Sequence, residues 1–348
     1  MTATLKKYST PLLFACLLTS AQVRAEGPDV EKKKTYTKSY TVSNSDNVSF
    51  NNQFGELKIN TWDKNEVKVT VTITAEASTD EKAQTILDHI SIEDGKTNEG
   101  VYFNTKLDKQ RDNNWSNGEK TRFRIDYVVN MPARNPLTAK NDFGPMVIDD
   151  YSGEVTLESK YGSMTTGKLG NVKRVDIEYG KGTIESINNG SLIIKYSKAS
   201  IGNIDGNVNA VIEYSTVSKL GVDNNAKALT VKNSYSKLNV NVNANISANF
   251  DISTSYGNLH NNTNFDIKEE GADGDRYGPR FNKRYQGKSG SGNIAMKIKS
   301  EYGQVTLTHD SNSDMNDDDN RKEKNKNKDK DKEKDKEKDK DKKTAVRI

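Results

Sequence analysis

Between residues 32 and 140, apolar residues repeatedly alternate with polar ones. This period of two is typical of a β-strand with one buried face. The clearest case is residues 67–73, where valine or isoleucine occupies every second position between lysines and threonines. The same alternation predicts strands at residues 48–50, 57–59 and 123–129.

One segment of this region has the period of a helix instead. Four apolar residues are spaced to share one helical face: Ala83, Ile86, Leu87 and Ile90. Ser78 and Glu81 precede them at the spacing of a capping box. Residues 26–140 are therefore predicted to form a β-rich N-terminal cap that contains one short helix.

From residue 141 onwards, a polar residue, an aromatic residue and a small residue recur together. The aromatic positions are Phe143, Tyr161, Tyr179, Tyr196, Tyr214, Tyr235, Tyr256 and Tyr302. A period near 20 residues indicates a solenoid, and the glycine, asparagine and β-branched content excludes helical repeats. Residues 141–310 are thus predicted to form a parallel β-solenoid, right-handed by the general crossover preference. An insertion at about residues 261–291 separates the last aromatic position from the others.

Parity within each predicted strand assigns the repeated tyrosines to a face. Val175 and Ile177 share parity with Tyr179, and the other repeats follow the same rule. Residues of one parity lie on one face of a strand. We therefore expect the tyrosines to point into the core as an aromatic stack, with the following glycine or serine forming the corner and glycine taking a positive φ.

The residue before each aromatic is expected to face outward. The first five such residues alternate in sign: Asp142, Lys160, Glu178, Lys195 and Glu213. On stacked repeats each charge would lie between two opposite charges. This pattern predicts a ladder of ion pairs, in which Glu178 matters more for stability than Glu158.

Both ends of the chain differ in composition from the repeats and distort the average hydrophobic fraction, which is 32%. Residues 1–25 have the layout of a secretory signal peptide, with two lysines, a short apolar run and a small-residue cleavage site. Cys16, the only cysteine, lies there. Lipidation of Cys16 is an alternative, because Leu13 and the two following residues form a possible acylation box. No later stretch is apolar enough to span a membrane.

Residues 311–348 alternate lysine with acidic residues and contain almost nothing apolar, so a disordered tail is predicted. Removal of the signal peptide and its three basic residues takes the formal net charge from +4 to +1. A chain with this net charge has no strong positive electrostatic field that would attract nucleic acid.

Candidate chemistry is sparse. The three histidines are scattered, no metal or cofactor motif occurs, and Asp149 and Asp150 are adjacent, so a strand would point them to opposite faces. The insertion repeats an arginine and an aromatic residue every four positions: Arg276, Tyr277, Arg280, Phe281, Arg284 and Tyr285. These residues could contact an anionic or sugar ligand. Alternatively, the aromatics fold over the solenoid and the arginines are solvated, which the sequence favours.

Several motifs resemble a family of exported bacterial β-solenoid proteins, the adhesin family of the auto-transporter adhesin head or GIN type, a domain of unknown function. They are residues 52–63 (NQFGELKINTWD), 127–132 (YVVNMP), the Tyr-Gly or Tyr-Ser repeats, and 290–294 (GSGNI). The resemblance covers nearly the whole mature chain except the tail. It implies a secreted or envelope-located, non-enzymatic protein.

The sequence thus predicts an exported, non-enzymatic, adhesin-like binding or structural protein without a cofactor. Its expected location is the periplasm, the outer-membrane surface or the extracellular space, and its expected partner is an unknown protein or glycan of the cell envelope. Two alternatives remain: a polysaccharide-active β-helix enzyme, and a periplasmic envelope-maintenance factor.

Overall fold

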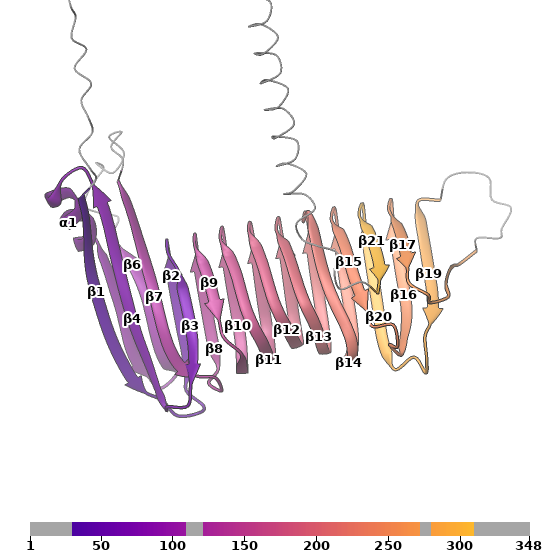
Figure 1. Ribbon diagram of the computed structural model, residues 1–348, viewed down its shortest axis with the longest axis horizontal. Coiled ribbons are helices and arrows are strands. Elements are labelled where there is room, and N and C mark those ends of the chain that lie inside the picture. Colours follow the sequence, from indigo (N-terminus) through magenta and orange to yellow (C-terminus); the bar gives the residue numbers. More distant parts are fainter. Residues whose placement is uncertain (1–29, 109–120, 272–279, 310–348) are drawn as a thin grey trace, which may run out of the picture.

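The computed structural model describes residues 30–108, 121–271 and 280–309, and these residues are almost entirely β-structure. They form one sheet of 21 strands that does not close on itself, together with one helix, α1 (Asp80–Asp88). The strands lie side by side along the long axis of the molecule (Figure 1). The predicted all-β class with one short helix is confirmed.

Four long strands connect two rows of this sheet. They are β11 (Ser163–Glu178), β12 (Lys181–Lys195), β13 (Lys198–Glu213) and β14 (Val217–Ser234). Each has a register irregularity near its middle, so that its C-terminal part pairs within row 1 and its N-terminal part pairs within row 2.

Row 1 begins with five strands, which in spatial order are β5 (Ile90–Thr97), β6 (Gly100–Leu107), β2 (Asn47–Gln53), β8 (Leu137–Asp142) and β10 (Tyr151–Lys160). After the long strands it continues with β20 (Ile294–Glu301), β16 (Ala248–Ser255), β19 (Asn282–Lys288) and β18 (Ile267–Glu269). Most neighbours are parallel; β5, β18 and β19 pair antiparallel.

Row 2 begins with β1 (Val30–Thr41), β4 (Glu66–Ala77), β7 (Arg122–Pro132), β3 (Leu57–Trp62) and β9 (Pro145–Ile148). After the long strands it ends with β15 (Lys237–Val242), β21 (Gln304–Thr308) and β17 (Asn258–Asn262). Only β1, β4 and β7 pair antiparallel here.

The hydrophobic core consists of the alternate side chains that the strands bury. In β11, for example, Met164, Leu169, Val175 and Ile177 are almost fully buried. Equivalent residues stack in register from repeat to repeat, as Ile177 does with Ile194 of the next strand. Burial of one such side chain contributes about 1.5–3 kcal/mol. The buried residues form one cluster that runs from the N-terminal strands to the last repeat.

The order of the repeats in space differs from their order in the chain. β20 lies between β14 and β16, and β21 lies between β15 and β17. The last repeat in the chain therefore does not lie at the end of the stack. The chain places β16 and β17 one repeat farther out, forms the antiparallel β18–β19 pair, and then returns to fill the gap. The same arrangement, in which a strand lies between two strands that are distant from it in the chain, occurs at the other end: β2 lies between β6 and β8.

Helix α1 forms where the sequence predicted it, but its cap is one residue later. Thr79 is the N-cap, because its hydroxyl accepts a hydrogen bond from the Lys82 backbone N–H at 3.3 Å. The Ser78 hydroxyl accepts from the Lys82 ammonium instead. Three residues of the predicted apolar face, Ala83, Ile86 and Leu87, are buried in α1, whereas the fourth, Ile90, begins β5. The helix packs against β1 and β4.

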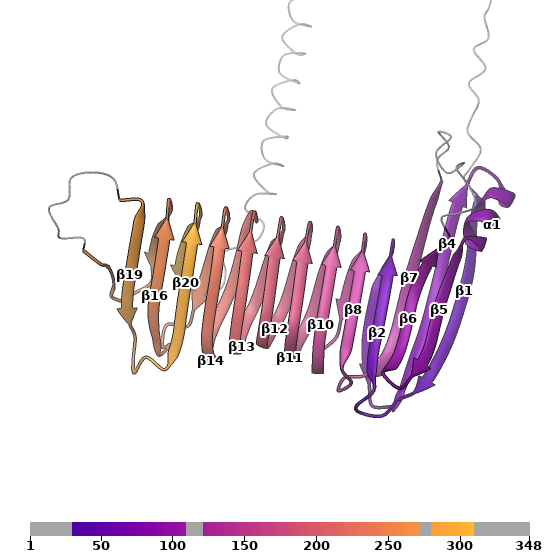
Figure 2. The same ribbon diagram turned by 180° about the vertical axis from the view of Figure 1, so that it is seen from behind.

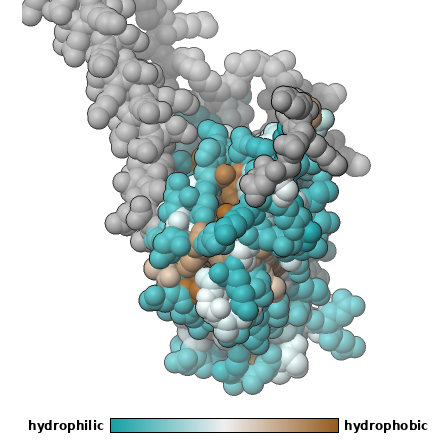
Figure 3. Space-filling model, turned by 90° about the vertical axis from the view of Figure 1, so that its right-hand side faces the viewer, coloured by the Kyte–Doolittle hydropathy of each residue, from teal (hydrophilic) through white to brown (hydrophobic). Residues whose placement is uncertain are grey.

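Both ends of the sheet carry features that oppose edge-to-edge aggregation. The edge strand β1 carries four lysines along its length: Lys32, Lys33, Lys34 and Lys38. At the opposite end, β18 and β19 cover row 1 with antiparallel pairing. Figure 2 shows β19 at this end of the molecule. Figure 3 views this end directly, and hydrophobic surface is confined to a central band between hydrophilic margins. Charged or irregular edges of this kind are a common protection against sheet extension.

Several sequence predictions fall outside the described residues. These are the signal peptide at 1–25, Cys16 and the tail at 311–348. Within the described ranges, no helix is both long and apolar enough to cross a membrane.

The bend in β12 provides a test of the two-row arrangement. Gly190 has a φ of 90°, and a Cβ atom there would lie 2.0 Å from the Val172 carbonyl oxygen. We expect Gly190→Ala to destabilise the protein by about 1–3 kcal/mol, through clash and backbone strain. Chemical denaturation measures this change. Gly170→Ala is the control, because its nearest backbone contact would be 3.3 Å and its φ is ordinary; equal losses in both variants would contradict the assignment.

Candidate functional site: an exposed aromatic ladder

Ten aromatic side chains form a continuous column along one edge of the two rows, which we call the aromatic ladder. In spatial order they are Phe54, Phe143, Tyr161, Tyr179, Tyr196, Tyr214, Tyr235, Tyr302, Tyr256 and Phe281. Eight come from the repeats recognised in the sequence. Phe54 and Phe281 were not predicted as members. The sequence around Phe54 could have indicated its membership, since a glycine follows it as in the other repeats. No such sequence feature marks Phe281.

The rings stack with nearly constant geometry. From Phe54 to Tyr256, neighbouring ring centroids are 4.8–5.1 Å apart and neighbouring planes differ by at most 8°. Phe281 ends the column at 4.9 Å from Tyr256 with a 25° tilt. The spacing equals the distance between hydrogen-bonded strands. Each ring face is therefore covered by its neighbours, and the ring edges remain.

The ladder faces solvent, so the prediction of core-facing tyrosines is wrong. The ring-bearing residues from Phe143 onwards are 46–55% exposed. Parity counting failed because the strand ends at the residue before the aromatic. In β11, for instance, Glu178 is the last strand residue and Tyr179 has a φ of 54°. The left-handed backbone conformation of Tyr179 turns its own side chain to the side opposite the one that parity predicts.

All ladder residues except Phe281 have a φ between 49° and 64°. Backbone hydrogen bonds hold this conformation. The Tyr179 N–H donates to the Lys195 carbonyl at 3.1 Å, and the Tyr196 N–H donates to the Glu213 carbonyl at 3.0 Å. Each aromatic residue from Phe54 to Tyr256 makes the equivalent bond to the next strand. The ladder of backbone bonds thus continues around the corner and aligns the rings.

The small residue after each aromatic does not supply the positive φ that the sequence suggested. Its role is close approach: a Cβ atom on Gly162 would lie 2.0 Å from the Gly144 carbonyl oxygen. Where serine replaces glycine, its hydroxyl bonds the backbone instead. Ser197 Oγ accepts from the Gly180 N–H at 3.1 Å and donates to the Lys195 carbonyl at 2.7 Å.

Structural stabilisation alone does not explain why these positions are aromatic. A non-glycine residue in the left-handed region costs about 1–2 kcal/mol. A stacked aromatic pair contributes about 0.5–1.5 kcal/mol. The two quantities largely cancel, and asparagine would adopt the same backbone with less strain. Strain held at an exposed surface is characteristic of functional sites.

The tyrosines also carry hydrogen-bonding groups without protein partners. No hydroxyl of the seven ladder tyrosines hydrogen-bonds to any part of the chain that the structure describes. The ladder therefore presents a line of ring edges and phenolic hydroxyls, each of which can donate and accept one or more hydrogen bonds.

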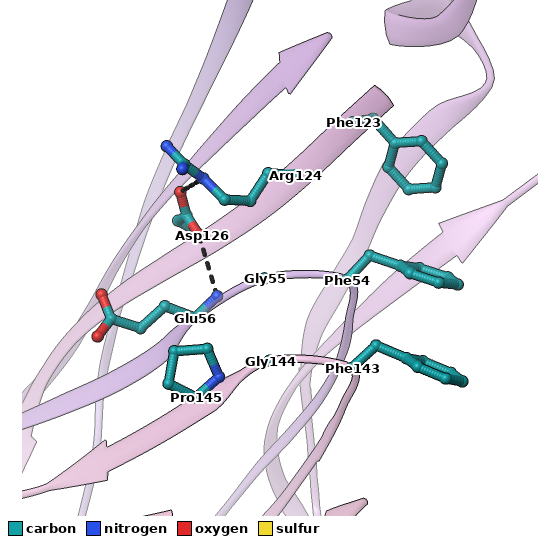
Figure 4. A pocket seen from close by; sticks show the side chains of 9 residues that line it. All are labelled: Phe54, Gly55, Glu56, Phe123, Arg124, Asp126, Phe143, Gly144 and Pro145. Atoms are coloured by element: carbon teal, nitrogen blue, oxygen red, sulfur yellow. Dashed lines mark hydrogen bonds and ion pairs between the residues drawn. The ribbon is translucent and has the colours of Figure 1, made fainter. Parts of the chain in front are cut away.

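A hollow of about 640 Å³ adjoins the first two rings (Figure 4). The rings of Phe54, Phe143 and Phe123 point to one side, and Gly55 and Gly144 separate them from a polar side. There, Arg124 Nε contacts Asp126 at 2.6 Å, and Asp126 accepts the Glu56 backbone N–H at 3.0 Å. The hollow thus combines apolar ring edges with an ion pair and the exposed backbone of the glycine corner.

A second hollow, of about 510 Å³, lies beside the far half of the ladder. Its lining includes Tyr235, Tyr302 and Tyr256, and on the other side Lys237 and Gln304. Both hollows occupy the row 2 side of the rings. The surface beside the ladder is therefore recessed at two places along its length.

The row 1 side of the ladder carries the charges that the sequence predicted. Lys160 Nζ lies 2.9 Å from Glu158 and 3.5 Å from Glu178, and Lys195 Nζ lies 3.0 Å from Glu213. Glu158 also contacts Lys140 at 3.3 Å. The expectation that Glu178 outweighs Glu158 is not supported by this geometry, because Glu158 bridges two lysines.

Two neighbouring carboxylates on this side have pKa values shifted in opposite directions. Burial raises the pKa of Glu158, but hydrogen bonds from Lys160 and Lys140 outweigh burial, so that its pKa is lowered overall. Burial raises the pKa of Asp176, its partner in register, and the Arg174 guanidinium only partly offsets this.

The arginine-aromatic segment contributes to this site only in part. Arg276 and Tyr277 lie outside the described residues. Tyr285 is packed into the core at 9% exposure, whereas Phe281 ends the ladder. Arg280 lies 3.7 Å from Glu269, and Arg284 contacts Asp251 at 3.0 Å. Ligand binding by this segment stays a prediction.

Other candidate groups are engaged by the backbone. Asp149 accepts the Thr61 N–H at 3.2 Å, and Asp150 accepts the Lys168 N–H at 2.8 Å. Over the described ranges, no group of three or more histidine, cysteine or acidic side chains could hold a metal ion.

Because strain and stacking largely cancel, loss of two rings should change the stability of the protein only slightly. We expect the double variant Tyr196→Asn/Tyr214→Asn to change the free energy of unfolding by no more than about 1 kcal/mol, because relief of strain offsets lost stacking. Chemical denaturation of the folded protein checks this. A loss of several kcal/mol would show that the rings are principally structural.

The shifted carboxylates predict opposite effects of neutralisation. Between the ordinary aspartate pKa and the raised value, the native state binds more protons than the unfolded state, so Asp176 costs stability as pH rises through this window. Asp176→Asn should raise the thermal midpoint at pH 7, and the gain should vanish at pH 3. Glu158→Gln should lower the midpoint at pH 7, since a lowered pKa contributes stability above the ordinary glutamate value. If both variants changed the thermal midpoint in the same direction at pH 7, the opposite pKa shifts of Asp176 and Glu158 would be contradicted.

No protein-family model and no curated protein matches this chain. Among solved structures, it is similar to a "putative adhesin" from Parabacteroides distasonis, with 12% identity and a TM-score of 0.33, over 79% of this chain and 97% of that one. It is also similar to a "putative adhesin" from Bacteroides fragilis, with 10% identity and a TM-score of 0.29, over 79% of this chain and 97% of that one. A "putative lipid binding protein" from Parabacteroides distasonis is similar with 10% identity and a TM-score of 0.28, over 79% of this chain and 96% of that one.

Proposed function

We propose that this protein is an exported, non-enzymatic binding protein of the bacterial cell envelope or surface, and that the aromatic ladder binds a linear polymer. The observation that carries the proposal is the half-exposed column of strained rings. Its hydroxyls have no partner among the described residues, and its net contribution to stability is expected to be small. A ligand that satisfies these hydroxyls would supply the free energy that the fold does not gain from them.

The shape of the site favours an extended ligand over a compact one. The ladder repeats every 4.8–5.1 Å over eight successive ring pairs, and hollows adjoin it near both ends. A pyranose ring in an extended chain is about as long as this spacing. An extended peptide advances about 3.3 Å per residue and does not place one residue on each ring. The geometry therefore supports a glycan chain that lies along the ladder.

The framework proposed for this surface is a right-handed parallel β-solenoid. Successive repeats pair in parallel over both rows, and buried residues remain in register, as Ile194 does with Ile212. The right hand follows from the general preference for right-handed parallel crossovers. Export rests on the signal-peptide pattern of residues 1–25, and residence outside the cell or in the periplasm follows from it.

Binding is tested with the full chain and a set of soluble linear polysaccharides, by affinity electrophoresis and calorimetry. We expect wild-type protein to bind at least one polymer, and Tyr196→Asn/Tyr214→Asn to weaken that binding at least about tenfold, a loss near 1.4 kcal/mol. Tyr196→Phe/Tyr214→Phe keeps the rings and removes the hydroxyls, so it separates hydrogen bonding from ring contact.

Val128→Asn is the matched control, because Val128 is an exposed apolar residue, at 40%, that lies outside the ladder. It should bind like wild type. Binding that survives loss of both tyrosines, or that Val128→Asn reduces equally, would refute the ladder as the binding surface. Protease treatment of intact cells distinguishes a surface protein from a periplasmic envelope-maintenance factor.

A further inference from the structure

The two sides of the aromatic ladder differ in charge. On the row 1 side, lysines alternate with carboxylates and form ion pairs, as described for Lys160 and Lys195. On the row 2 side, the first two outward positions after each corner from Ser163 onwards contain lysine and neutral residues only. The lysines are Lys181, Lys198, Lys219 and Lys237. This basic margin, as we call it, follows the ladder on the side of the hollows.

Two of these lysines are direct neighbours. Lys181 of β12 is in register with Lys198 of β13, so their backbones are one strand spacing apart. Like charges directly opposite each other destabilise a sheet by some tenths of a kcal/mol. On the row 1 side, the residues directly before the rings alternate in sign instead, as Lys160 does with Glu178. The positions nearest the ladder therefore form ion pairs on row 1, whereas two lysines are adjacent on row 2.

Two lysines of the basic margin are not paired with a carboxylate of the described residues. Lys181 and Lys237 form no ion pair with any residue of the described ranges, and Lys237 lines the second hollow. The nearest acidic residue along β12 is Glu185, which is two outward positions farther and pairs with Lys168. A ligand on the ladder would lie beside these ammonium groups.

This inference rests on the proposed function and specifies its ligand. We propose that the polymer bound by the ladder is an acidic polysaccharide, whose hydroxyls bond the tyrosine edges and whose carboxylates or sulfates pair with the basic margin. A single-stranded nucleic acid also carries negative charge, but its bases bind proteins by stacking on aromatic faces. In this ladder the faces are covered by neighbouring rings, so the site favours sugars over bases.

The test compares polymers that differ only in charge. The acidic probes are β-1,4-linked polymannuronate and polygalacturonate. Their neutral counterparts are β-1,4-linked mannan and fully methyl-esterified polygalacturonate, and oligo(dT) serves as the nucleic-acid probe. We expect at least one acidic polymer to bind at least about tenfold more tightly than its neutral counterpart, with an affinity that falls as salt is raised.

The double variant Lys181→Ala/Lys237→Ala should lose most of this preference, with binding of the acidic probe weakened about tenfold. Lys232→Ala/Lys297→Ala is the matched control, because it removes two exposed lysines from β14 and β20 on the row 1 side. It should change binding less than about twofold. Thermal denaturation of all variants confirms that each remains folded.

The outcomes separate the two proposals. Equal binding of acidic and neutral polymers, unchanged by Lys181→Ala/Lys237→Ala, would overturn the acidic ligand while leaving the ladder as a glycan site. Tighter binding of oligo(dT) than of any polysaccharide would overturn the choice of sugar over nucleic acid. Absence of binding to every probe would overturn both proposals.

Discussion

The structure depends on backbone hydrogen bonds that continue around the corner between the two rows. At each corner, the N–H of the aromatic residue donates to a carbonyl of the adjacent strand, as Tyr196 does to Glu213. This bond holds the aromatic residue in the left-handed conformation and sets the spacing of the rings equal to that of the strands. Core stacking, ion pairing and ring stacking all follow from the same register. A change that shifted one repeat would disturb all three together.

The sequence predicted the strand class, the short helix and the repeat positions, because these depend on local period. It did not predict the direction of the tyrosines, because one residue in the left-handed region reverses the alternation on which parity depends. Val175 and Ile177 point inward as predicted, while Tyr179, at the same parity, points outward. The spatial order of the repeats could not be predicted from the sequence either. Nothing local to Tyr302 indicates that its ring lies between Tyr235 and Tyr256.

Aromatic residues at strained corners, charge alternation on one side and a basic margin on the other are independent features of the sequence. Packing requires none of them: the core is complete in the alternate residues of the strands, and glycine or asparagine would suit the corner backbone. They coincide only at the exposed surface along the ladder. That coincidence is easier to explain by an extended ligand than by the needs of folding.

A ladder of edges differs from the usual aromatic binding platform. Sugars and bases commonly contact ring faces, which attract them through the ring quadrupole and through dispersion. In this protein the faces stabilise one another, and the surface offers polarised ring hydrogens with hydroxyls at a fixed repeat. Such a surface gains little from any single contact but sums many equivalent contacts along a polymer. Affinity should therefore grow with the number of sugar units until the ladder is filled, as expected for multivalent binding to a preorganised array.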